Sequence, residues 1–581
     1  MILVFGGTTE GRKAVEVLEE AGTTYYYSTK TGEQNIALHH GVRTDGAMDK
    51  LAMQAFCQEH QIRLVVDAAH PFASQLHQTI ADVAELLDIP VVRYERIYPP
   101  RDREITWIDD YSQVPRNIRS LLATTGVQSI SKLKPLEAEG MKICYRILPR
   151  ESSIQMAHAQ GATDSQLCYY EDGNAILVEA EAILLKESGL SGGFLEKVNE
   201  AKAKGMRILA LKRPDVPQMH EGTTVCNGPY GLRRAVEKLL PDFYPLHSGL
   251  TTGTCATAAA IAATMRLFHG ETPAEVPVVL PDGETIMVAV GYGDGYAYCI
   301  KEAGDDPDVT NGVEVRASVE KSDAFRILGG EGVGTFSLPG FDFPPGEPAI
   351  NKGPRQMMRD NIHEQVCITI SVPQGATIAQ KTFNPRLGIE GGISIIGVSG
   401  IVKPFSEAAF INSIRKCMEV AKASGTDRVV INSGAKSERF VKACYPALPQ
   451  QAFVEYGNYI GETLKMADEL GFENVTLGVM LGKAVKLAEG HLDTHSKKAV
   501  MNKTFVRQML DEAGVSIDLS PVTLARELWK MIPQEKLRDF AATIICHCAR
   551  HCRPLMPNGS LTILLIDDNG HIYSNPQTQD N

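Results

Sequence analysis

The sequence lacks any apolar run long enough for a membrane-spanning helix. Its first apolar stretch, residues 2–5, is too short for a secretory signal and has no basic residues before it. We therefore expect a cytoplasmic protein without a membrane partner. The 12 cysteines show no repeating framework, so we expect no disulfide-built fold and a reducing compartment that keeps them as thiols.

An excess of positive charge is missing too. The chain has 58 Lys and Arg residues against 70 Asp and Glu residues, which gives a formal net charge of −12. This balance argues against nucleic acid as the main partner. A polyanionic small molecule would need cations gathered at one place, because the overall field of the protein repels it.

At 581 residues the chain is longer than one hydrophobic core usually serves, so at least two domains are expected. The segment Pro241–Pro245 ends a predicted helix, and residues 247–260 (HSGLTTGTCATAAA) read like the start of another protein. Their threonine hydroxyls can cap the helix of small residues that follows. We predict that residues 1–243 and 247–581 fold as independent units.

The first unit opens with a strand at 2–5, a glycine-rich turn at 6–12 (GGTTEGR) and a helix. Glycines let a ligand approach the backbone and the start of a helix attracts an anion, so this pattern predicts a phosphate-binding loop. A turn without ligand is the alternative, because the spacing is not G-x-G-x-x-G. After the next strand, Ser28, Thr29 and Lys30 favour the 2′-phosphate of NADPH over the ribose of NADH, unless Lys30 is only a solvated surface residue.

A third strand, at 63–66, leads into residues 67–73 (DAAHPFA) at the edge where open α/β sheets bind ligands. His70 precedes Pro71, so its backbone is extended and its side chain can point into a crevice. A histidine held in the loop by hydrogen bonds is an equally good interpretation. Further glycine-rich strand exits, such as 183–193, complete a pattern of two Rossmann-like halves that face each other across a cleft.

These motifs, with Thr-Thr-Gly at 124–126 and the lysine-to-double-glycine segment 186–193, occur in the same order in precorrin-6A reductases, which the first unit resembles. The resemblance implies hydride transfer from NADPH or NADH to a carbon–carbon double bond of a corrin-pathway macrocycle. The resemblance implies that Gly6, Gly7, Thr8, Thr9, Pro71 and Phe72 contact the cofactor, and the end of the second strand adds Ser28 and Lys30. The resemblance also implies that Lys186, Ser188 and Gly189 face the cleft. A proton must still reach the other carbon of the double bond, and Lys186, His70 and water are the candidate donors.

The second unit has loops that are typical of ligand contact. The cluster at 327–334 (ILGGEGVG) is too rich in glycine for an ordinary core and favours close approach of the backbone to a ligand. The segment 381–397 (KTFNPRLGIEGGISIIG) spaces Pro and Gly so that no single regular element forms, and its Lys381 and Arg386 can pair with carboxylates. A rigid turn at 346–355 ends on another cation, Arg355.

Two clusters invite a metal interpretation, and neither pattern supports one. The acidic residues at 305–308 fit no Ca²⁺ loop; an acidic turn, or carboxylates beside the pocket of a sulfonium cation, are the alternatives. The Cys and His residues at 546–552 lack a second ligand pair, so buried helix thiols are expected rather than a zinc site. We therefore predict no metal site.

The second unit resembles cobalt-precorrin-5B C(1)-methyltransferases along essentially its full length. The residues that carry this resemblance are 248–256 (SGLTTGTCA), 308–312 (DVTNG), 346–351 (GEPAIN), 381–394 and 493–496 (DTHS). It implies S-adenosylmethionine as methyl donor, a cobalt-containing tetrapyrrole as acceptor, and a fold without the usual Rossmann methyltransferase core. Because methyl transfer from a sulfonium needs alignment more than acid–base help, we assign cations to the acceptor and a glycine loop to the donor. The acceptor residues are Arg355, Lys381 and Arg386, and the donor residues are Gly329, Gly330, Gly332 and Gly334.

Together the patterns predict an α/β protein: two Rossmann-like halves, then an α+β or α/β methyltransferase unit. The expected function is a bifunctional enzyme of anaerobic cobalamin synthesis that methylates cobalt-precorrin-5B to cobalt-precorrin-6A and reduces that product to cobalt-precorrin-6B. Tethering would hold the second site at an effective concentration on the order of millimolar. The alternatives are a nucleotide-dependent enzyme pair acting on another polycarboxylate, and a non-catalytic redox sensor that binds NAD(P)H and a tetrapyrrole. The oligomeric state is left open, with a homo-oligomer as one option.

Overall fold

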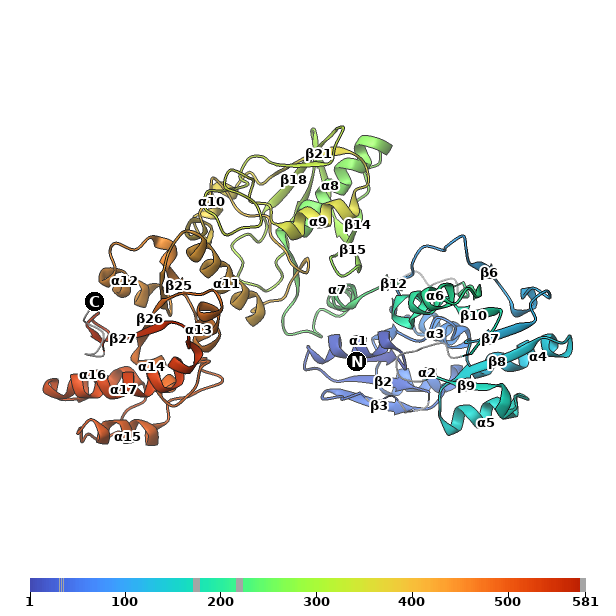
Figure 1. Ribbon diagram of the computed structural model, residues 1–581, viewed down its shortest axis with the longest axis horizontal. Helices are drawn as coiled ribbons and strands as arrows, with labels where there is room; N and C mark the ends of the chain where they lie inside the picture. The colour runs from blue at the N-terminus through green and yellow to red at the C-terminus, as the bar shows by residue number, and fades with distance from the viewer. Residues whose placement is uncertain (31, 33, 35, 171–177, 216–222, 575–581) are drawn as a thin grey trace. The chain divides into compact units, whose positions relative to one another are not determined.

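The computed structural model describes residues 1–574 except 31, 33, 35, 171–177 and 216–222 (Figure 1). The chain divides into two compact units, the first made of residues 1–248 with 277–288 and the second of 249–276 with the residues from 289 onward. This division lies near the predicted boundary, but it groups a short hairpin segment of the later sequence with the first unit. Independent folding of residues 1–243 and 247–581 stays a prediction.

The first unit is built from two parallel sheets. Its strands are β1 (Ile2–Phe5), β2 (Tyr25–Thr29), β3 (Gly41–Asp45), β4 (Leu64–Asp67), β5 (Val91–Tyr94), β6 (Thr106–Ile108), β7 (Ser120–Ala123), β8 (Lys142–Ile147), β9 (Leu167–Tyr169), β10 (Ala182–Lys186), β11 (Arg207–Leu211) and β12 (Thr223–Cys226). The first sheet has the order β12-β5-β4-β1-β2-β3 and the second β6-β11-β10-β7-β8-β9. The chain thus returns to the first sheet after completing the second, which confirms the predicted two-half α/β pattern.

Helices cover both faces of each sheet, as continuous apolar strands require. They are α1 (Thr9–Glu19), α2 (Lys50–Glu59), α3 (Ser74–Leu87), α4 (Ile130–Ala138), α5 (Glu151–Ala159), α6 (Phe194–Ala203) and α7 (Pro229–Leu239). One face of the first sheet packs against α1 and α7 and the other against α2 and α3. The central strand β1 is almost fully buried, with Val4 between Tyr27 and Val66 of its neighbours. The loops at its carboxyl end are therefore held on a rigid support.

The second unit begins with a long helix, α8 (Thr252–His269), that is capped by Thr251 and buried over residues 252–264. Alanines and threonines allow this close packing against β17 and β18 of a five-stranded sheet with the order β16-β17-β18-β21-β19. The elements of this part are β13 (Gly249–Leu250), β16 (Gly291–Gly293), β17 (Tyr296–Ile300), β18 (Glu314–Lys321), β19 (Arg326–Gly329), β20 (Thr335–Phe336), α9 (Lys352–Asn361), β21 (Val366–Ser371), α10 (Gly375–Ala379), β22 (Ile389–Glu390) and β23 (Ile401–Val402). The hairpin of β14 (Glu275–Val279) and β15 (Thr285–Ala289) lies largely in residues 277–288, which group with the first unit.

The rest of the second unit is an α/β sheet with the order β25-β24-β26-β27-β28, parallel except for its last strand. Its elements are α11 (Glu407–Ala423), β24 (Arg428–Asn432), α12 (Ala435–Cys444), β25 (Phe453–Glu455), α13 (Ile460–Glu469), β26 (Asn474–Met480), α14 (Leu481–Ala488), α15 (Lys503–Glu512), α16 (Leu528–Met531), α17 (Leu537–Cys552), β27 (Ser560–Ile566) and β28 (Ile572–Ser574). Among the described residues, no helix is both long and apolar enough to cross a membrane.

Candidate functional site

The glycine-rich loop after β1 has the form of an anion site. Thr8 caps α1: its hydroxyl accepts a hydrogen bond from the Gly11 amide at 2.9 Å and donates one to the Ala68 carbonyl at 2.7 Å. Gly7 has φ = +87°, a conformation that glycine adopts without strain, and no atom lies within 4 Å of a Cβ added there. Open space therefore faces the start of α1, whose first amides have no partner inside the helix.

Two side chains already use polar groups of this loop. The Gly7 amide donates to the Tyr27 hydroxyl at 3.1 Å, and that hydroxyl donates in turn to Gln34. The Gln34 amide nitrogen donates to the Thr8 carbonyl at 3.0 Å. The donors left for a phosphate are therefore the first amides of α1 around Thr9, rather than the glycine amide itself.

The residues predicted to select NADPH lie mostly inside the fold. Ser28 is buried within β2, and its carbonyl accepts from the Gly6 amide at 3.0 Å. Thr29 donates to the Asp45 carboxylate at 2.7 Å, so only Lys30 offers a side chain to solvent. Sequence reasoning missed Asp45, which ends the neighbouring strand β3 and places negative charge beside this position. The preference for NADPH stays a prediction that depends on Lys30.

A buried ionic network fixes the loop after β4. The Asp67 carboxylate lies 2.7 Å from His77 Nδ1 and 2.8 Å from Arg93 Nη1, and all three side chains are at most 6% exposed. Burial acts to raise the pKa of Asp67, but the His77 hydrogen bond and the Arg93 charge bring it below its usual range. His77 Nε2 lies 3.0 Å from the His70 carbonyl. The network thus positions His70. Asp67 opens the 67–73 motif, but its buried pairing with His77 and Arg93 did not follow from the sequence.

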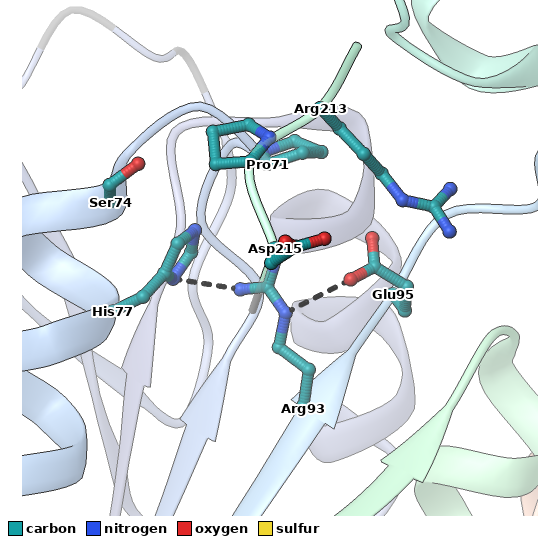
Figure 2. Close-up of a pocket in the computed structure, with 8 residues that line it drawn as sticks. Pro71, Ser74, His77, Arg93, Glu95, Arg213 and Asp215 are labelled. Carbon is teal, nitrogen blue, oxygen red and sulfur yellow. Dashed lines mark hydrogen bonds and ion pairs between the residues drawn. The ribbon is translucent and has the colours of Figure 1, made fainter. Parts of the chain in front are cut away.

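A pocket lies beside this network at the carboxyl ends of the strands. Figure 2 shows the Arg93 guanidinium between His77 and Glu95, with Arg213 above Glu95. Arg93 Nε lies 3.4 Å from Glu95, and the Arg213 guanidinium stacks on the Tyr98 ring at 3.6 Å. Of the residues predicted from sequence, only Pro71 lines this pocket.

The structure brings His70, Phe72 and Lys186 together from the two halves. Lys186 Nζ lies 4.9 Å from the centre of the Phe72 ring, and the His70 ring lies 5.9 Å from it. Burial, followed by the charges of Arg96 and Lys186, lowers the pKa of His70 to about 3, and its Nδ1 accepts from the Phe72 amide at 3.2 Å. Burial lowers the pKa of Lys186 to about 8. Lys186 is therefore the better proton donor near neutral pH, because His70 stays uncharged.

A second buried pair joins the halves around this cluster. Arg96 Nε lies 2.8 Å from Glu10 in the first turn of α1, and Arg96 Nη1 donates to the Ser188 carbonyl at 2.7 Å. Glu10 also accepts from the Ser191 hydroxyl. Gly189 has φ = +71° and packs against Arg96. Ser188 and Gly189, predicted to face the cleft, thus hold Lys186 in register with the glycine-rich loop.

Two of the three cations predicted to bind the acceptor have partners in the chain. Arg386 Nη1 lies 2.7 Å from the Glu438 carboxylate. Arg355 donates to the Ile350 carbonyl at 2.8 Å and to Glu347 at 3.1 Å, which stabilises its own turn. Lys381 is exposed, and its ammonium has no hydrogen bond or ion pair to any described residue. Lys381 is therefore the predicted clamp that remains open to a ligand.

The predicted donor glycines pack against the chain's own backbone. A Cβ added at Gly332 would collide with the Val372 carbonyl, and one at Gly334 would press on Gly392. Gly329 and Gly330 are closed off in the same way by Pro348 and Ser371. These glycines let three chain segments approach one another, so the geometry supplies no support for a donor site here.

The two clusters considered as metal sites contain ion pairs and buried thiols. Asp308 lies 2.6 Å from the Lys301 ammonium, which is buried, so the acidic turn contains an ion pair. Cys548 and Cys552 are buried as predicted, whereas Cys546 is exposed and His547 lies 2.7 Å from Glu512. No group of three or more potential metal ligands occurs within the part of the chain that the structure describes.

Two family models match the chain, one in each unit. The model described as precorrin-6x reductase CbiJ/CobK matches residues 1–227, and the CbiD model matches residues 242–404. The cobalt-precorrin-5B C(1)-methyltransferase of Prosthecochloris aestuarii is 40% identical over 345 residues, which cover 55% of this chain and 94% of that protein. The protein of the same name from Thermus thermophilus is 43% identical over 310 residues, covering 51% of this chain and 84% of that protein.

Two solved structures are also similar. The cobalamin biosynthesis protein CbiD from Archaeoglobus fulgidus is 29% identical, covers 44% of this chain and 83% of its own, and has a TM-score of 0.26. A structure described as CobK precorrin-6A reductase is 16% identical, covers 41% of this chain and 96% of its own, and has a TM-score of 0.34.

Proposed function

The chain belongs to the cobalt-precorrin-5B C(1)-methyltransferase family, and we propose that its two units catalyse two successive steps of cobalamin biosynthesis. The second unit methylates cobalt-precorrin-5B to cobalt-precorrin-6A, and the first unit reduces that product to cobalt-precorrin-6B. The observation that carries this proposal is the pairing of a methyltransferase relative matched over 94% of its length with a reductase model matched over residues 1–227. Nothing observed favours the sensor or the enzyme pair acting on another polycarboxylate. A cytoplasmic location stays a prediction.

In the first unit, a bound nicotinamide cofactor would supply the hydride. The open space at Gly7 and the first amides of α1 fit its phosphates, because helix starts attract anions. Phe72 would offer an apolar surface to the reacting groups, and Lys186 would hold the proton that the second carbon needs. The Glu10–Arg96 pair keeps these elements, which come from both halves, in one arrangement.

In the second unit, S-adenosylmethionine would supply the methyl group. The residues of the chain have to align donor and acceptor, since an in-line displacement depends on geometry. Lys381 is the cation best placed to pair with an acceptor carboxylate, because its ammonium is not paired with a described residue. Arg386 instead positions the loop through Glu438.

Mass analysis of the products tests both steps with the full-length protein. Cobalt-precorrin-5B with S-adenosylmethionine alone should become heavier by one methyl group in place of a hydrogen. Adding NADPH should then add two further hydrogens. Methylation without reduction would remove the function assigned to the first unit, and recovery of unchanged substrate would overturn the whole proposal.

A further inference from the structure

A hollow in the second unit combines aromatic rings with one carboxylate. It lies between the turn Asn384–Leu387, helix α11 and strand β25. Its walls include the rings of Phe383, Phe410 and Phe453 and the charged groups of Arg386 and Glu455. Phe383 is 41% exposed, which leaves its ring accessible to a ligand.

The hollow extends along strand β25 to the carboxyl end of that strand. Strand β25 ends at Glu455, and its neighbour β24 ends at Asn432. The chain leaves β24 towards β25 and then crosses to β26, which pairs with the opposite side of β24. Ligands of open α/β sheets bind outside the carboxyl ends of strands. The reversal here lies between β24 and β26, and the hollow flanks the adjoining edge strand β25. Gly434, just before α12, lies next to the Glu455 carboxylate.

Glu455 is half-buried, and its carboxylate makes no hydrogen bond or ion pair with any residue that the structure describes. The nearby cations are engaged elsewhere: Arg386 pairs with Glu438, and the Lys483 ammonium donates to the Gly457 carbonyl. Burial raises the pKa of Glu455 above its usual range, while the Arg386 charge opposes this shift. A carboxylate withdrawn from water without a partner costs stability, and proteins tolerate that cost where function requires it.

We propose that this hollow binds S-adenosylmethionine, with the Glu455 carboxylate facing the sulfonium and the phenylalanine rings packing against the adenosyl group. A sulfonium has no N–H or O–H to donate, so it is held by negative charge and by the faces of aromatic rings. Phe383 and Arg386 belong to the 381–397 loop, in which Lys381 is the proposed acceptor clamp, so donor and acceptor would meet along one segment. This inference rests on the methyltransferase function proposed above and replaces the glycine cluster as the donor site.

Titration calorimetry on the full-length protein tests the contact. S-adenosylhomocysteine is the matched probe, because it lacks the methyl group and the positive charge on sulfur. Glu455→Gln should weaken binding of S-adenosylmethionine about 10-fold or more, and binding of S-adenosylhomocysteine by less than about 3-fold. Its melting temperature should be unchanged or higher, since an unpaired buried charge is removed. Glu469→Gln, at an exposed carboxylate paired with Arg415, is the matched control and should change neither affinity.

Unchanged S-adenosylmethionine affinity in Glu455→Gln would overturn the proposed site, and equal weakening of both ligands would overturn the sulfonium contact. If that variant does not fold, Phe410→Leu decides: it should weaken both ligands, and full affinity would refute the site. A wild-type protein that neither binds S-adenosylmethionine nor methylates cobalt-precorrin-5B would remove the proposed function itself. A wild-type protein that does both, with normal donor binding by Glu455→Gln, would remove only this inference.

Discussion

Replacing Lys186 by methionine removes the proposed proton donor while keeping an unbranched side chain of similar length. Burial lowers the pKa of Lys186 from 10.5 to about 8. This difference corresponds to roughly 3 kcal/mol by which the folded protein disfavours the charged form. A buried ammonium at this position weakens the fold at neutral pH, so its presence needs a functional reason.

The stability of the variant has a definite sign. Because the folded pKa lies below the unfolded one, the folded state releases the proton first, and stability rises with pH between about 8 and 10.5. The charged lysine therefore costs stability below pH 8, and Lys186→Met should be more stable there by up to roughly 3 kcal/mol. The advantage should disappear above pH 10.5. Urea denaturation of both proteins at several pH values measures this difference.

The reductase activity should change in the opposite direction. Loss of a positioned general acid typically lowers a rate by about 10²- to 10⁴-fold, so kcat for reduction of cobalt-precorrin-6A should fall by that factor. The wild-type rate should decline as pH rises through about 8, where Lys186 loses its proton, and the variant should lack this decline. Lys132→Met is the control: it removes an exposed charge that lowers the Lys186 pKa, so the decline should move to higher pH. A Lys186→Met enzyme with wild-type kcat and the same decline would refute the assignment.

Three substitutions and one fragment test other parts of the first unit. Gly7→Val should abolish nicotinamide binding and spare methyl transfer, because valine is strained at φ = +87°. Fluorescence titration with NADPH measures the binding, and retained binding would contradict this reasoning. Lys30→Ala should raise KM for NADPH and leave KM for NADH nearly unchanged, because it removes a charged contact to the 2′-phosphate that is worth about 1.5–3 kcal/mol. Equal use of both cofactors by the wild type would exclude that contact. The Glu284 carboxylate accepts hydrogen bonds from the Tyr230 and Gly231 amides at the start of α7. Burial raises the pKa of Glu284 to about 7, so the folded state holds its proton longer than the unfolded state does. The stability of the protein should therefore fall as pH rises from 4.5 towards 7. In urea denaturation, Glu284→Gln should show a smaller change of stability with pH. A fragment of residues 1–243, which lacks Glu284, should be soluble but less stable than the same unit in the full chain.

Strands were predictable where apolar runs are short and bounded by glycine or proline. The strand predicted at 2–5 coincides with β1. Errors occurred where polar residues continue a strand: β2 runs to Thr29 and β4 to Asp67, so residues expected in turns are buried in a sheet. Hydrophobic pattern cannot show this, because those side chains are stabilised by partners that pattern does not identify.

The ionic networks were not predictable for the same reason. Asp67 meets Arg93, and Glu10 meets Arg96, only after separate strands have been placed side by side. In the sequence each is one charged residue among many, and spacing does not say which of them will be buried together. The glycines of 327–334 led to the opposite error. Their density suggested a ligand loop, whereas in the structure they let segments of the chain's own backbone pack closely.

Pairing separates the charged residues of this chain into two groups with different roles. Arg355, Arg386 and the Glu10–Arg96 pair have their charges satisfied inside the fold, so they stabilise loops and a ligand would have to compete with those contacts. Lys186 and Glu455 are partly buried without ion-pair partners among the described residues, and each has its pKa shifted towards the neutral form. Burial of that kind destabilises the free protein and is relieved when a ligand supplies the missing charge or takes the proton. We therefore expect ligands to contact Lys186 and Glu455, together with the exposed Lys381, which is unpaired among the described residues, rather than the paired arginines.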